Sequence, residues 1–83
     1  MKVYKKEVVS GVDGVIELEA QNYTASILNL GNGTLWASFN KPIDADAVEI
    51  PANVAYEHKP LETFNSIYLR TDSSTRVQVV ITR

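Results

Sequence analysis

A short acidic stretch holds the densest group of oxygen ligands in this sequence. It consists of Asp44, Asp46 and Glu49, with the amide of Asn40 shortly before them. Carboxylate and amide oxygens are the ligands that a hard cation such as Ca²⁺ prefers. The spacing, however, lacks the ligand pattern and the central glycine of an EF-hand loop, and acidic loop residues mostly face water. We therefore predict no metal site here.

The other candidates for chemistry are a histidine and a pair of carboxylates. His58 lies between Glu57 and Lys59, and one imidazole cannot build the multi-histidine metal site of some jelly rolls or be matched to a nucleophile. We predict a solvated loop histidine. Glu17 and Glu19 share one face of a predicted strand, roughly 7 Å apart, but a charged outer face explains both. The prediction is a protein that is not an enzyme, with no catalytic residue, metal or cofactor.

The remaining side chains suited to binding are mostly aromatic. Trp36, Tyr56 and Tyr68 are candidates for exposed strand faces, and Arg70 lies on the same side of its strand as Tyr68. Tyrosine, tryptophan and arginine are enriched in the hot spots of protein interfaces. We predict that these four residues contact another subunit. A sugar-binding platform and simple core filling are the alternatives.

The composition is that of one small globular domain. The chain has 83 residues, of which 45% are hydrophobic and 22% charged, so a single domain spans residues 1–83. A domain of this size buries a modest fraction of its surface, and self-association that covers another face would add stability. We therefore expect a homo-oligomer.

Charge and cysteine content narrow the partners and the compartment. The net charge of −2 and the pI near 5.2 provide no basic field for phosphates, so we expect no nucleic-acid partner. Cysteine is absent, which excludes disulfides and thiolate sites. No apolar run matches a signal-peptide core or a membrane span, so we expect a soluble protein made in the cytoplasm, with no membrane partner.

The stretch from 26 to 40 predicts a β-hairpin around which the fold is organised. Two apolar segments flank Gly31-Asn32-Gly33, and Gly-Asn and Asn-Gly dipeptides tolerate the positive φ of tight turns. In the second segment the side chains alternate between a core-facing set that begins at Leu35 and an opposite set that begins at Trp36.

Alternating hydrophobicity predicts further strands on both sides of this hairpin. Residues 1–9 predict an edge strand or an N-terminal arm that reaches a neighbouring subunit. The proline-containing segment 41–60 predicts a long loop that crosses between the sheets, with a short edge strand near residues 54–57. The clearest further strands are 15–20, 66–71 and 75–82. Seven or eight short strands without a helix predict an all-β fold, a small antiparallel β-sandwich or jelly roll.

From Ser26 to the C-terminus, the order of these features resembles small β-sandwich virion proteins of tailed bacteriophages. That group includes capsid decoration proteins and the capsid-bound bases of head fibres. The residues that carry the resemblance are Asn29, Gly31, Gly33, Thr34, Asn40, Ile50-Pro51, Ile67-Tyr68-Leu69 and Val77-Gln78-Val79-Val80.

The resemblance implies a non-enzymatic virion structural protein in a decoration, cement or fibre-base role. Such a protein binds the capsid surface as a symmetric homo-oligomer, with a trimer favoured, and its partner is the major capsid protein or another virion protein. It is made in the host cytoplasm and ends in the virion. The alternative, suggested by Trp36 and the tyrosines, is a carbohydrate-binding or receptor-binding β-sandwich module.

Overall fold

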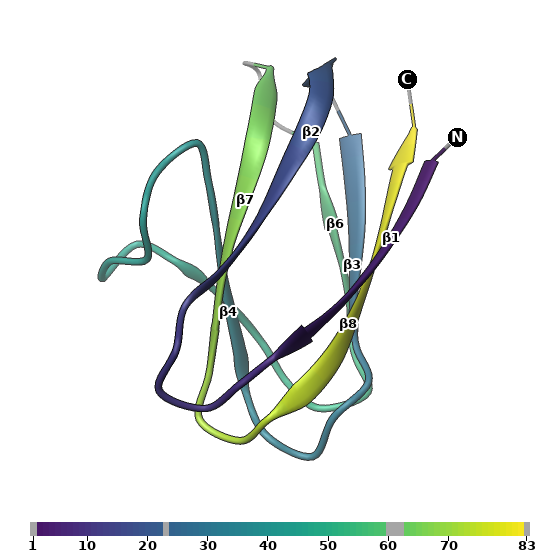
Figure 1. Ribbon diagram of the computed structural model, residues 1–83. Helices are drawn as coiled ribbons and strands as arrows, with labels where there is room; N and C mark the ends of the chain where they lie inside the picture. The colour runs from purple at the N-terminus through teal and green to yellow at the C-terminus, as the bar shows by residue number, and fades with distance from the viewer. Residues whose placement is uncertain (1, 23, 60–62, 83) are drawn as a thin grey trace.

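Eight short strands in two facing sheets make up the computed structural model (Figure 1). It describes residues 2–22, 24–59 and 63–82, without the side chains of residues 19–22 and 82. Within these ranges no helix is long and apolar enough to cross a membrane. The strands are Lys2–Val8 (β1), Gly14–Asn22 (β2), Thr24–Asn29 (β3), Leu35–Phe39 (β4), Val48–Ile50 (β5), Ala55–His58 (β6), Phe64–Thr71 (β7) and Thr75–Thr82 (β8).

The pairing of the strands defines the topology. The first sheet has the order β1-β8-β3-β6 and the second sheet the order β2-β7-β4-β5. Each strand of the first half of the chain pairs antiparallel with one of the second half: β1 with β8, β2 with β7, β3 with β6 and β4 with β5. The chain is thus one long hairpin, rolled so that successive pairs fall in alternate sheets. This wrapping is a jelly roll, and it confirms the predicted all-β fold class.

The core lies between the sheets and follows the predicted alternation. Ile67 and Leu69 of β7 face inward, as do Val77, Val79 and Ile81 of β8. The strands predicted at 66–71 and 75–82 from alternating hydrophobicity are thus confirmed, each with one face in the core. The complete set of buried apolar side chains is Val8, Ile16, Leu18, Ala25, Ile27, Leu35, Ala37, Ile50, Phe64, Ile67, Leu69, Val77, Val79 and Ile81.

The predicted hairpin between 26 and 40 is wrong. Its two segments form strands, but β3 belongs to the first sheet and β4 to the second. β3 pairs with β6 and β8, whereas β4 pairs with β5 and β7. The connection through Gly31-Asn32-Gly33 therefore crosses from one sheet to the other instead of turning back within one sheet.

The two glycines of this crossing are required for space. Neither Gly31 nor Gly33 has a positive φ, so neither serves the tight turn that their sequence suggested. A Cβ atom on Gly31 would collide with the side chain of Thr75, and one on Gly33 would collide with that of Asp72. The glycines thus allow the crossing to pack closely against the β7–β8 connection.

The N-terminal segment forms an edge strand of the domain. β1 pairs along its whole length with β8, from Lys2 opposite Ile81 to Val8 opposite Thr75. Lys6 points toward the interior side, with its aliphatic stem close to Gly14 of β2. A charged side chain that points inward on an edge strand discourages pairing with another chain.

Asn29, at the end of β3, joins the two sheets through a buried side chain. Its amide nitrogen donates to the carbonyl oxygens of Gly33 (2.9 Å) and Ile50 (3.1 Å). Its amide oxygen accepts from the backbone nitrogen of Gly31 (3.1 Å) and the hydroxyl of Thr75 (2.9 Å). The side chain is fully buried with all its hydrogen-bonding groups in use, so it holds together both sheets and the crossing between them.

The first prediction concerns this side chain. Asn29→Ala leaves two carbonyls, one backbone N–H and one hydroxyl without their partner in a buried site. Each orphaned group costs about 1–3 kcal/mol, and partial access of water lowers the sum, so we expect a loss of about 3 kcal/mol in the free energy of unfolding. Urea denaturation followed by circular dichroism measures it.

The matched control is Asn32→Ala, because Asn32 lies in the same crossing with an exposed side chain. This control should change stability by less than about 0.5 kcal/mol. Equal losses in the two variants would contradict the role assigned to Asn29.

Candidate functional site

The outer face of the second sheet carries three of the four residues predicted to contact another subunit. In the register of the strands, Trp36 of β4 lies between Arg70 of β7 and Glu49 of β5. Tyr68 of β7 lies between Val15 of β2 and Ser38 of β4. Because side chains alternate across a strand, all of them point away from the core. We call the surface of Val15, Trp36, Ser38, Tyr68 and Arg70 the aromatic face.

The aromatic face is partly exposed. Trp36 and Tyr68 are half-buried, Val15 is 37% exposed, and Ser38 is covered. A sheet face with half-buried aromatic rings offers apolar area together with the indole N–H and the phenol hydroxyl. Such a face is suited to contact with another protein surface.

Arg70 is held in place by a two-point ion pair. Its Nε atom donates to Oδ1 of Asp13 at 2.7 Å, and an Nη atom donates to Oδ2 at 2.8 Å. The hydrogen bond from Arg70 lowers the pKa of the Asp13 carboxyl and raises the pKa of the guanidinium. Both side chains remain partly exposed, so the pair adds little stability. Its effect is to orient the guanidinium beside Trp36 and to anchor the β1–β2 loop.

Tyr56, the fourth predicted contact residue, lies elsewhere. It belongs to β6 of the first sheet, opposite the buried Ile27, and packs against the core. Its hydroxyl is 3.1 Å from Nδ1 of His58. The structure therefore separates Tyr56 from the aromatic face and places it in core packing, the alternative considered for the aromatic residues.

His58 lies in a cluster of rings, and the prediction of a solvated loop histidine is wrong. Its ring stacks on that of Phe39 with centroids 3.5 Å apart and an interplanar angle of 3°, and it meets Phe64 edge to face at 5.3 Å. His58 ends β6 of the first sheet, whereas Phe39 ends β4 of the second. The stack therefore bridges the two sheets. Burial lowers the pKa of the His58 imidazole, because the charged form loses hydration there.

A hollow of about 280 Å³ opens beside this cluster. Phe39, Asn40, Asp46 and His58 are among the residues that line it. Its volume is slightly below the range usual for small-molecule pockets. The amide oxygen of Asn40 already accepts from the backbone nitrogens of 65 and 66, so it serves the fold.

The acidic stretch does not assemble into a cation site. Lys41 forms ion pairs with Asp44 at 3.0 Å and with Asp46 at 4.0 Å, and its hydrogen bond lowers the pKa of Asp44. Glu49 points to the aromatic face instead, beside Trp36. Within the described residues, no group of three or more acidic, histidine or cysteine side chains is arranged to hold a metal ion.

The paired glutamates of β2 are only partly described. Glu17 is exposed on the outer face of the second sheet, opposite Ser66. The side chain of Glu19 lies outside the described part of the structure. The pairing of β2 with β7 shifts register between Glu17 and Asn22.

The comparisons with known proteins leave the function to be argued from this geometry. No known protein family matches the sequence, and a search of curated proteins finds no similar one.

The sequence analysis missed the roles of Asn29 and His58. The available signal for His58 was its spacing of two from Tyr56, which places both side chains on one face of β6.

The second prediction follows from the lowered pKa of His58. The unfolded chain, with an ordinary value of 6.5, binds more protons than the folded chain once the pH falls to that value. The stability contributed by the neutral ring is therefore complete above pH 6.5 and is lost as the pH falls through the lower folded value. Unfolding free energies measured by urea titration across this window should show the loss.

His58→Phe is the matched variant, because a phenyl ring can stack on Phe39 and does not titrate. The free energy of unfolding of this variant should decrease less than that of the natural protein as the pH falls through the window. The groups facing His58 are Tyr56, the two phenylalanines and Asp46 across the hollow. If the free energies of unfolding of the two proteins changed equally with pH, protonation of His58 would not affect the stability of the fold.

Proposed function

We propose that this chain is a non-enzymatic structural protein of a virion, which binds the capsid surface as a symmetric homo-oligomer. The observation that carries the proposal is the aromatic face. There Trp36, Tyr68 and Arg70, all of residue types common in interface hot spots, share one side of a sheet. The expected partner is a major capsid protein or another virion protein.

The edge strands of the two sheets are poorly suited to pairing with another chain, which supports contact through the face of a sheet. β5 and β6, at two of the edges, have three and four residues. At a third edge, β1 carries Lys5 and the inward-pointing Lys6. Short strands and lysines at the edges oppose edge-to-edge pairing. The aromatic face offers apolar area that a partner can cover.

The topology agrees with this proposal. Jelly rolls of eight strands occur in viral capsid proteins and in lectins, and the resemblance of the sequence from Ser26 onward is to phage virion proteins. A fold hosts many functions, so the topology supports the proposal without deciding it. The aromatic face decides where the contact is expected.

The third prediction tests the role of the aromatic face. The purified chain should sediment as an oligomer, with three times the 9.2 kDa chain mass favoured, and should pellet with empty capsids from the same genome. Trp36→Ala and Tyr68→Ala should each weaken oligomer formation or capsid binding by about tenfold or more. Analytical ultracentrifugation and capsid co-sedimentation measure the two effects.

Val3→Ala is the matched control, because Val3 is an exposed apolar residue on the outer face of the first sheet. It should behave like the natural protein, and circular dichroism checks that every variant folds. A monomer that ignores capsids, or a source genome without a major capsid protein, would overturn the virion role.

The second candidate is a carbohydrate-binding or receptor-binding module. It is favoured by the position of Trp36, whose ring has hydrogen-bonding side chains on both sides, Arg70 and Glu49. An aromatic ring with flanking polar groups can stack on a sugar and orient it. A glycan array in which the natural protein binds and Trp36→Ala does not would favour this candidate. An array without binding would remove it.

A further inference from the structure

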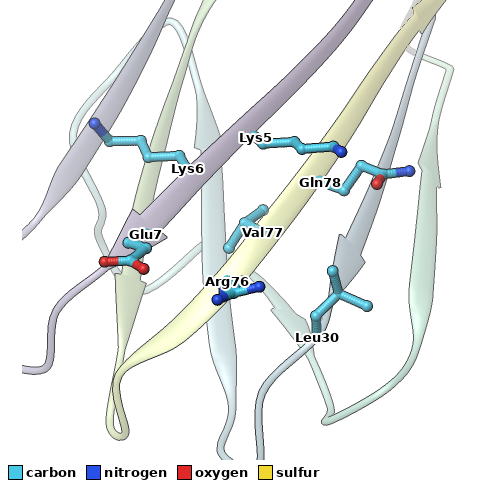
Figure 2. A pocket seen from close by; sticks show the side chains of 7 residues that line it. All are labelled: Lys5, Lys6, Glu7, Leu30, Arg76, Val77 and Gln78. Atoms are coloured by element: carbon cyan, nitrogen blue, oxygen red, sulfur yellow. The ribbon is translucent and has the colours of Figure 1, made fainter.

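Two adjoining hollows form a groove on the first sheet, remote in the fold from the aromatic face. One has a volume of about 340 Å³ and is lined by residues of β1 and β8 together with Leu30 (Figure 2). The other, of about 550 Å³, continues toward the crossing and the β7–β8 connection. Both are lined by Glu7, Leu30 and Arg76, so they form one continuous surface. We call it the β1–β8 groove.

Strand register brings the lining residues together from three parts of the chain. Lys5 lies opposite Gln78, and Glu7 lies opposite Arg76, all on the outer face of the β1–β8 pair. Leu30 follows the last residue of β3, and its backbone nitrogen donates to the carbonyl of Arg76 at 2.9 Å. Because the side chain of Asn29 is buried, that of its neighbour Leu30 is directed outward.

The groove has exposed apolar walls. Leu30 is 49% exposed and Val9, which lines the second hollow, is 54% exposed. Two further exposed valines, Val12 and Val54, lie in other loops at the same end of the sandwich. Single exposed apolar residues are common, but a gathering of them beside a groove is typical of a contact surface.

The ion pairs formed among residues 2–22, 24–59 and 63–82 do not include the cations of the groove. Within the described residues, Lys41, Lys59 and Arg70 each have a carboxylate within 4.0 Å. In the part of the chain that the structure describes, Lys5, Lys6 and Arg76 form no such ion pair, although Glu7 lies opposite Arg76 in the register. Lys5, Lys6 and Arg76 all line the first hollow. Figure 2 shows the side chains of Lys5 and Lys6 extending to opposite sides of β1, with that of Lys5 directed toward Gln78, so we take Lys5 and Arg76 as the cations on the groove side.

We propose that the β1–β8 groove binds an extended peptide segment of a partner protein, in which an acidic residue is flanked by aliphatic ones. The carboxylate would pair with Arg76 and Lys5, and the aliphatic side chains would pack on Leu30 and Val9. Arginine binds a carboxylate through two parallel hydrogen bonds, which gives such a contact direction. Apolar walls with two cations fit a peptide better than a polyphosphate, which needs a denser basic field.

This inference goes beyond the proposed function, because the groove uses a different sheet from the aromatic face. An array of randomised peptides of about six residues, each spanning roughly 20 Å when extended, provides the probes. When the array is incubated with the labelled natural protein, the peptides that bind should be enriched in sequences with an aspartate or glutamate between aliphatic residues. Fluorescence anisotropy then measures the affinity of the best peptide for the protein. A companion peptide, in which lysine replaces the acidic residue, serves as the control.

The fourth prediction concerns the variants in this assay. Arg76→Glu and Leu30→Ser should each weaken binding of the selected peptide by about tenfold or more, and the lysine companion should bind the natural protein at least about tenfold more weakly. Lys59→Glu, a charge reversal outside the groove lining, should bind like the natural protein. Thermal melts confirm that each variant is folded.

Trp36→Ala separates this inference from the proposed function. It should bind the peptide normally even where it no longer associates with capsids. The assignment of the groove is overturned if the array enriches no acidic sequences, if the lysine companion binds equally well, or if Arg76→Glu keeps full affinity. Loss of peptide binding in Trp36→Ala with the groove variants unaffected would place the peptide on the aromatic face instead.

Discussion

The buried amide of Asn29 is the interaction on which the arrangement of the two sheets depends. The side chain starts from the first sheet, reaches the carbonyl of Ile50 at the end of the second, and satisfies both glycines of the crossing. A buried amide is stabilising only while all its donors and acceptors are paired. Here every one is paired, and the hydroxyl of Thr75 completes the set. The network fixes the relative positions of loops that come from distant parts of the chain.

The rolled hairpin explains which parts of the fold could be predicted from sequence. Alternation of apolar side chains is a local signal, so strands such as β7 and β8 and the residues that they bury were predicted correctly. Pairing is non-local, because β1 meets β8 from the other end of the chain. The glycines near residue 32 resembled a hairpin turn, and only the closeness of the β7–β8 connection shows that they provide space for a crossing.

For the candidate site, too, the local features could be predicted from the sequence and the non-local ones could not. Period-two alternation was enough to place Trp36 away from Leu35, and Arg70 on the same side as Tyr68. It could not show that β4 and β7 are neighbours, which brings these residues together. Tyr56 was expected on an exposed face of a short edge strand near residues 54–57, and His58 was placed in a loop because of the surrounding prolines and charges. In the fold, β6 closes the edge of the first sheet, and its inward side chains complete the core with Phe39 and Phe64.

The outer faces of the two sheets differ in the side chains that they expose. The jelly roll makes this possible, because each sheet has one face in the core and one face outward. The aromatic face presents half-buried rings with Arg70 neutralised by Asp13, which suits a broad contact whose energy comes from covered apolar area. The β1–β8 groove presents cations that pair with no carboxylate of the described residues, beside exposed aliphatic side chains, which suits a narrow segment with its own charge. Because each sheet has one face in the core, its other face is open to selection for contact. If both proposals hold, the domain would have one partner on each outer face, and linked contacts of modest strength on two surfaces give a tighter assembly than either alone.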